Sequence, residues 1–122
     1  IYGCRKAAIG ERIMTYASIK DLLDEIGLPY TYDHWDTESV PELPWIVFTY
    51  PGRDDFVADD GIYQKIISLQ IDLYTDQKDL QAEAMVEQVL EQNGIVYTKE
   101  ETYIASEKMY EITYETELII NG

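Results

Sequence analysis

The residues that could do chemistry are few, and the first of them is the single histidine. His34 lies between Asp33 and Asp36 in the segment YDHWD. A histidine beside carboxylates can bind a metal ion or transfer a proton, but a hydrolytic metal site needs three or more ligands in a defined geometry. No second His or Cys lies at ligand spacing, and Cys4 alone cannot form an internal disulfide. We therefore interpret His34 as a surface-loop residue and predict no metal site and no cofactor.

Two pairs of adjacent acids form the second group that could do chemistry. The pairs Asp54–Asp55 and Asp59–Asp60 stand close together in the sequence and invite a general acid/base dyad. Neighbouring residues on a strand point to opposite faces, so adjacency does not bring two carboxyl groups together. The alternative is that they are solvated acids of a hairpin, and Asp60–Gly61 suits a tight turn because glycine accepts a positive φ.

Covalent and nucleotide chemistry have no support in the sequence. The serines at positions 39, 68 and 106 lack the small-residue turn of a nucleophile elbow, and none of the seven glycines belongs to a phosphate-binding loop. We predict that the protein is not an enzyme.

The charge of the chain excludes further classes of function. Its 122 residues include 24 acids and 9 bases, which gives a net charge of −15. Such a surface repels phosphate backbones and anionic lipid, so nucleic-acid and membrane-surface binding are poor hypotheses. With 46% apolar residues and eleven tyrosines, the chain can still bury a core of ordinary size. The composition predicts one acidic, folded domain.

The first thirteen residues differ from the rest. Residues 1–13 hold three bases and one acid, a net charge of +2. We expect a non-native or disordered N-terminal extension here, with Met14 as the natural start and residues 14–122 as a single α+β domain; an ordinary disordered arm is the alternative.

Apolar periodicity predicts two helices and five strands. Ile19, Leu22, Leu23 and Ile26 form one helical stripe that Thr15 or Ser18 can cap and Gly27 ends. A second stripe begins after the cap residue Asp79 and ends at Gly94; its members are Ala82, Met85, Val86, Val89 and Leu90. The predicted strands are a short piece near residues 28–35, then 45–50, 62–74, 95–99 and 109–120.

The order of these elements predicts the fold class. The sequence reads α-β-β-β-α-β-β, and two amphipathic helices on one face of a mainly antiparallel sheet bury the stripes economically. In the last strand, Glu111, Glu115 and Glu117 share one face. That face is either simply solvated or is kept anionic for a purpose.

A resemblance to a known family covers residues 14–120. The segments GLPYTYDHWD, ADDGIYQK and YTDQKD, together with the C-terminal strands, resemble the small tail-terminator or tail-completion proteins of siphophages and prophages of Gram-positive bacteria. The resemblance implies a structural subunit that forms a ring, commonly a hexamer, on the end of the tail tube and joins it to the head connector. The implied partners are further copies of the chain, the tube protein and the connector protein, with DNA passing through the ring without specific binding. The implied location is the head–tail junction of the virion, assembled in the host cytoplasm.

A ring subunit needs an element that reaches its neighbour, and the predicted hairpin can supply it. Apolar residues near the tip would anchor the contact while acids select a basic partner surface. The residues that we assign to this subunit interface are Arg53, Asp54, Asp55, Phe56, Val57, Asp59, Asp60 and Tyr63. The bases that could complete such contacts are Arg53, Lys65, Lys78 and Lys99.

A rival interpretation comes from another class of protein. An acidic DNA mimic, also common in phage genomes, would use the same charge to occupy the DNA site of a nuclease or repressor. It would be a stable monomer or dimer that binds one basic partner tightly, whereas a terminator would form rings.

Overall fold

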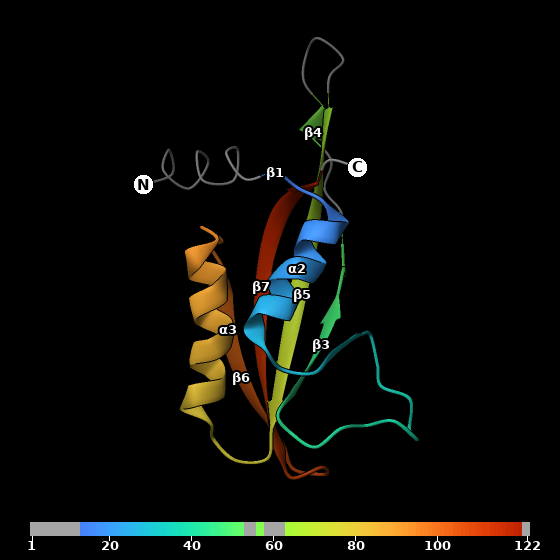
Figure 1. Ribbon diagram of the computed structural model, residues 1–122, viewed down its shortest axis with the longest axis vertical. Helices are drawn as coiled ribbons and strands as arrows, with labels where there is room; N and C mark the ends of the chain where they lie inside the picture. The colour runs from blue at the N-terminus through green and yellow to red at the C-terminus, as the bar shows by residue number, and fades with distance from the viewer. Residues whose placement is uncertain (1–12, 53–55, 58–62, 121–122) are drawn as a thin grey trace.

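A computed structural model of the protein describes residues 13–52, 56–57 and 63–120. The helices are α2 (Tyr16–Ile26) and α3 (Leu80–Gln92). The strands are β1 (Ile13–Met14), β2 (Tyr30–Tyr32), β3 (Trp45–Thr49), β4 (Phe56–Val57), β5 (Tyr63–Thr75), β6 (Thr98–Ile104) and β7 (Met109–Ile120) (Figure 1). The predicted α+β class and the predicted order are confirmed, with the two-residue strands β1 and β4 as additions.

The long antiparallel pair β5–β7 forms the centre of the sheet. Its register runs from Lys65 opposite Ile120 to Thr75 opposite Tyr110. On one side of this pair, β3 and β4 run antiparallel to β5, and β2 runs parallel to β3. On the other side, β6 runs antiparallel to β7 and β1 runs parallel to it. The sheet is therefore mainly antiparallel, and within the described ranges β2, β6 and the two-residue strands β1 and β4 each pair with a single strand and so lie at its edges.

Both helices begin and end at the predicted signals. Thr15 caps α2 through a reciprocal pair of hydrogen bonds with Ser18, and Gly27 ends it with φ 88°. Asp79 caps α3, because its Oδ1 accepts from the Ala82 amide at 3.0 Å. Gly94, with φ 70°, turns the chain out of α3. Side-chain caps of this kind satisfy amides that the first helical turn leaves without partners.

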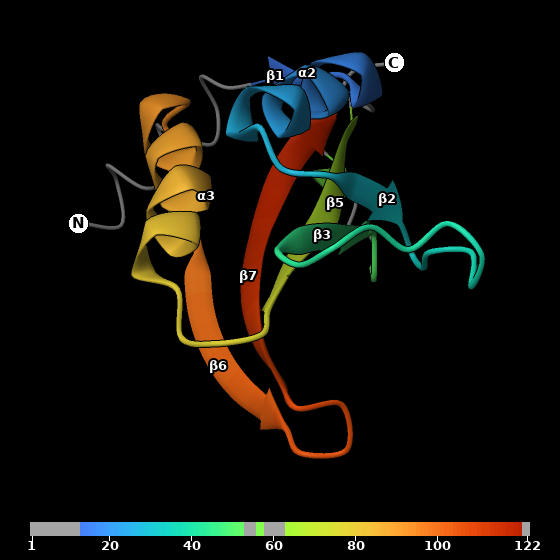
Figure 2. The same cartoon turned by 60° about the horizontal axis from the view of Figure 1, so that its bottom comes forward.

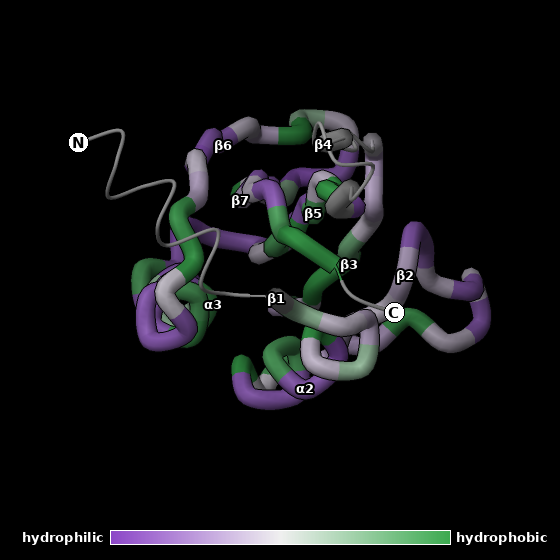
Figure 3. The backbone as a smooth tube through the Cα atoms, turned by 90° about the horizontal axis from the view of Figure 1, so that it is seen from above, coloured by the Kyte–Doolittle hydropathy of each residue, from purple (hydrophilic) through white to green (hydrophobic). Residues whose placement is uncertain are grey.

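The two helices lie on the same side of the sheet (Figures 2 and 3). We call this side the helix face and the other side the open face, because no described helix covers it. The buried stripes of α2 and α3 pack against alternate residues of the central strands, which include Ile67, Leu69, Ile71, Leu73, Ile112, Tyr114 and Leu118. The intervening residues of these strands point to the open face.

Several predicted strand boundaries differ from the structure. Only Tyr30–Tyr32 of the piece expected near residues 28–35 is a strand, and β3 ends one residue before its predicted end while β5 ends one residue after. The strand expected at residues 95–99 is β6, which covers Thr98–Ile104, because the chain through Ile95 still closes the C-terminus of α3. The Ile95 amide donates to the Leu90 carbonyl at 2.9 Å, and its side chain is buried in the core. Ile13, the last residue of the expected extension, pairs with Ile119 in β1; residues 1–12 lie outside the described ranges.

Candidate interaction surfaces

The predicted hairpin is present as a backbone pairing. Phe56 and Val57 form β4 and pair with Gln64 and Tyr63 of β5. In Figure 1 this pairing lies beyond the ends of both helices, at the far end of the long strand β5. The other interface residues that we predicted, which are Arg53, Asp54, Asp55, Asp59 and Asp60, lie outside the described residues.

The predicted anionic face is the open face of the sheet. Glu111, Glu115 and Glu117 alternate along β7 with the buried residues Ile112, Tyr114 and Leu118. Residues paired directly across the sheet share a face, and the register adds Asp72 and Glu100, which both lie opposite Thr113. Among the described residues, the open face therefore carries five carboxylates and no lysine. The five are Asp72, Glu100, Glu111, Glu115 and Glu117.

Asp72 is the unexpected member of this face. It alternates with Ile71 and Leu73, which are buried on the helix face, yet its own exposed fraction is only 5%. Oδ1 accepts from Thr113 Oγ1 at 2.8 Å, and the Gln70 amide lies 3.2 Å from Oδ1 and 3.0 Å from Oδ2. These donors are neutral, so no cation among the described residues meets this buried carboxyl group.

Glu111 is the partly buried neighbour of Asp72. The Tyr74 hydroxyl donates to its Oε2 at 2.9 Å. Burial raises the pKa of Glu111, and the nearby Asp72 carboxylate raises it further, against the lowering effect of the Tyr74 hydrogen bond. The Asp72 carboxylate thus disfavours a second negative charge on Glu111 in the middle of the open face.

Aromatic side chains border these two acids. The Trp45 ring lies 4.8 Å from the Tyr74 ring between centroids, and Trp35 packs edge-on against Trp45 at 5.8 Å. The Trp35 indole Nε1 is buried and has no hydrogen-bond acceptor among the described residues. Trp45 and Tyr74 pair directly in the register, which places them on the open face beside Glu111.

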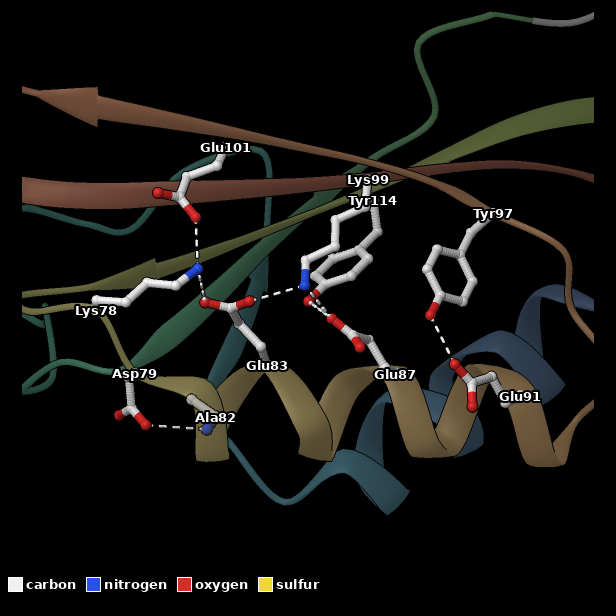
Figure 4. Close-up of polar contacts among 10 residues, drawn as sticks. All are labelled: Lys78, Asp79, Ala82, Glu83, Glu87, Glu91, Tyr97, Lys99, Glu101 and Tyr114. Atoms are coloured by element: carbon white, nitrogen blue, oxygen red, sulfur yellow. Dashed lines mark hydrogen bonds and ion pairs between the residues drawn. The ribbon is translucent and has the colours of Figure 1, made fainter.

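The helix face carries a different kind of polar cluster, which joins α3 to β6 (Figure 4). Glu83, only 3% exposed, lies between two lysines: Lys78 Nζ is 2.6 Å from Oε2, and Lys99 Nζ is 2.8 Å from Oε1. The contact between Lys99 and Glu83 is an ion pair without a hydrogen bond, because Glu83 Oε1 has no correctly aligned donor among the described residues. Lys78 also contacts Glu101 at 2.5 Å, so charges of both signs alternate along this cluster.

The cluster continues along α3 towards β7. Lys99 Nζ lies 2.6 Å from Glu87 Oε2, which also accepts from the Tyr114 hydroxyl at 2.8 Å. Burial alone would raise the pKa of Glu83, but the two ammonium groups outweigh it and hold that pKa below its ordinary value. The carboxylates in turn raise the pKa of both lysines.

This cluster changes the expected role of two lysines. We expected Lys78 and Lys99 to be available for contacts with other subunits, but both pair with carboxylates of their own chain. No pattern in the sequence predicted the cluster, because it depends on how α3 is placed against β6. Lys65 is exposed, and Arg53 lies outside the described residues.

His34 lies in the loop after β2, away from both clusters. Its side chain is 72% exposed, and its Nδ1 lies 2.9 Å from Asp33 Oδ2. Within residues 13–52, 56–57 and 63–120, no group of three His, Cys, Asp or Glu side chains is placed to hold a metal ion.

Comparisons with known proteins do not assign the chain to a family. No protein-family model matches the sequence, and no curated protein matches it. Among the described helices, none is both long enough and apolar enough to span a bilayer.

Proposed function

We propose that the protein is a phage structural subunit that caps the tail tube and joins it to the head connector, acting as a ring, with a hexamer as the expected form. The proposal starts from the resemblance of residues 14–120 to tail-terminator proteins. The observation that carries it is the β4–β5 pairing, which extends beyond the helices and the core. A strand pair that leaves the body of its own domain is suited to contact a neighbouring subunit.

The charge distribution supports a structural role over a catalytic one. The helix face joins acids to lysines inside the subunit, while the part of the open face that the structure describes carries acids and no lysine. In a ring, such carboxylates would form an anionic body through which DNA slides without adhering.

Truncation of the hairpin tests the proposal. Phe56→Ala and Val57→Ala should leave the circular dichroism melt unchanged and abolish ring formation or tail joining, because interface centres concentrate about 2 kcal/mol or more in single apolar residues. Rings are scored by electron microscopy in the presence of the tube protein, which can template assembly. Val40→Ala is the matched control, because Val40 is an exposed apolar residue of the proline-rich loop.

Each outcome of this experiment has a definite meaning. If Phe56→Ala unfolds the subunit, that residue belongs to the core and the hairpin does not reach a neighbour. If Phe56→Ala assembles normally and Val40→Ala does not, the interface lies in the loop at residues 36–44.

The five carboxylates of the open face favour a second candidate, the acidic DNA mimic. That function predicts a monomer or dimer that forms a stoichiometric complex with one DNA-binding protein, and DNA should compete with it. Size-exclusion chromatography with light scattering, in the presence and absence of tube protein, separates the two candidates.

A further inference from the structure

The middle of the open face combines features that simple solvation does not explain. A strand face that only contacts water needs exposed polar residues, as Glu115 and Glu117 are. Around Asp72, however, the face also holds the contacting pair Trp45 and Tyr74. Clustered aromatic residues on an uncovered face are typical of the centre of a protein interface.

The charges of this region define the chemistry of its partner. Asp72 is buried and receives only neutral donors, and Glu111 beside it receives one hydroxyl. A carboxylate has about four acceptor positions, so the half-buried Glu111 keeps acceptor capacity beyond its one bond. A cation placed beside Glu111 would gain this carboxylate and the neighbouring aromatic ring, with the buried Asp72 adding negative potential nearby.

We propose that the open face, centred on Trp45, Asp72, Tyr74 and Glu111, is a docking surface for a basic segment of another protein, with an arginine side chain as its anchor. Arginine suits the site better than lysine, because a planar guanidinium donates to carboxylates in pairs and stacks on aromatic rings. The inference goes beyond the proposed function, since it names the chemistry of a partner and holds for a ring or a monomer.

A second copy of the chain is a poorer occupant. Its lysines 78 and 99 are paired internally, and its exposed lysines 20, 65 and 108 lack the planar guanidinium that the site favours. Its hairpin sequence, residues 53–60, carries four acids against one arginine. With a net charge of −15, two copies repel each other at this face. Charge complementarity therefore favours a different, basic protein.

Peptide binding to the intact chain tests the proposal. The probes are an oligo-arginine peptide, an oligo-lysine peptide of the same length and an oligo-glutamate peptide, added at fixed ionic strength and measured by calorimetry. We expect the arginine peptide to bind tightest and the glutamate peptide not to bind. Glu111→Gln should weaken arginine-peptide binding about tenfold, because it removes the carboxylate that the guanidinium contacts. Asp72→Asn should weaken it about threefold, because it removes a buried negative charge beside the contact.

Glu117→Gln is the matched control, because it removes one charge from the same face at an exposed position. It should change binding less than about twofold, as charges at the rim of an interface do. Equal weakening by all three variants would overturn the proposal, since it would indicate attraction by net charge alone. Equal affinity for the arginine and lysine peptides would overturn the arginine anchor.

The two tryptophans provide a readout that reports on the place of binding. The chain contains only Trp35 and Trp45, and they pack against each other. Their indole N–H resonances should shift when the arginine peptide binds and should be unchanged by the glutamate peptide. Binding without any shift would place the peptide elsewhere and refute the site. Peptide binding and ring formation are separate measurements, so either proposal can fail while the other holds.

Discussion

The acidic side chains on the two faces of the sheet have opposite surroundings. On the helix face, Glu83 is buried between Lys78 and Lys99, and its pKa lies below the ordinary value. On the open face, Glu111 is half-buried beside Asp72, and its pKa is raised. The same strands separate the two environments, because alternate residues of β5 and β7 serve one face or the other.

This difference distinguishes a charge used for folding from a charge kept for another purpose. An ion pair between α3 and β6 fixes where the helix lies, so its net effect is on the subunit itself. Adjacent carboxylates with no described cation beside them do not help the isolated subunit. The proposed docking surface would give them a role outside it.

The largest effect should come from the apolar layer of the helix face. Leu69→Ala removes a fully buried side chain and should lower the free energy of unfolding by about 3 kcal/mol through lost burial and a cavity. Urea denaturation followed by circular dichroism measures it. Glu115→Thr, on the neighbouring strand of the open face, is the control and should change stability by less than about 0.5 kcal/mol. Similar losses for both would mean that the open face is packed as tightly as the core.

The next largest effect should come from the buried carboxylate of α3. Glu83→Gln keeps the shape but leaves two lysines against a neutral amide, and we expect a loss of about 2 kcal/mol. The loss is smaller than for a fully buried pair because the lysine side chains are 41% and 37% exposed. Glu101→Gln removes an exposed partner of the same Lys78 and should cost less than about 0.5 kcal/mol. Equal costs would show that burial of Glu83 is unimportant.

The stability contributions of the acids on the two faces should depend on pH in opposite directions. The folded-state pKa of Glu83 lies below 4.5, so its contribution to stability is complete above pH 4.5 and is lost as the pH falls through the lower value. The stability difference between the native chain and Glu83→Gln should therefore shrink below pH 4.5.

The opposite dependence is expected for Glu111, whose folded-state pKa lies above 4.5. Its contribution favours folding at pH values below 4.5 and is lost as the pH rises through the raised value. Relative to the native chain, Glu111→Gln should gain stability as the pH rises from 4.5 towards neutrality. Denaturation series at several pH values measure how the stability of each variant, relative to the native chain, changes with pH, with Glu117→Gln as the control. If Glu83→Gln and Glu111→Gln change in the same direction, the two faces do not differ in this respect.

The smallest effect should be at the margin of the helix face, where Tyr30 donates to Asp24 of α2 at 2.5 Å. This hydrogen bond, with smaller contributions from burial and nearby acids, raises the pKa of Tyr30 to about 12. Asp24→Asn should return that pKa towards 10.0 while changing stability at neutral pH by less than about 0.5 kcal/mol. Ultraviolet titration of tyrosinate measures the shift, with Tyr30→Phe identifying the affected group. The stabilising contribution should be present below pH 10 and lost as the pH rises towards 12.

The elements of the fold could be predicted because their signals are local. The apolar stripe of α2, its cap at Thr15 and its end at Gly27 all lie within thirteen consecutive residues. The alternation in β5 and β7 similarly predicts which residues pack against the helices without knowledge of the partner strand. Strands of two residues, such as β1 and β4, carry no periodicity and depend on their neighbours.

The polar clusters could not be predicted, because they depend on register and on helix placement. Asp72 has the sequence position of a solvated residue, and only its neighbours Gln70 and Thr113 reveal it as a buried acceptor. Glu83 adjoins the apolar stripe of α3 without belonging to it. Its burial follows from lysines that are 5 positions before it and 16 positions after it in the sequence.

The edge strand β6 has a consequence for how the protein behaves at high concentration. It pairs only with β7 among the described residues, so its outer backbone groups could template aggregation with another chain. Glu101 is the central residue of Thr98–Ile104, and antiparallel pairing of two such edges in full register would place one Glu101 directly opposite the other. Like charges in that position are destabilising. The strand therefore carries a charge that opposes fibre formation, on a carboxylate that Lys78 partly offsets within the subunit.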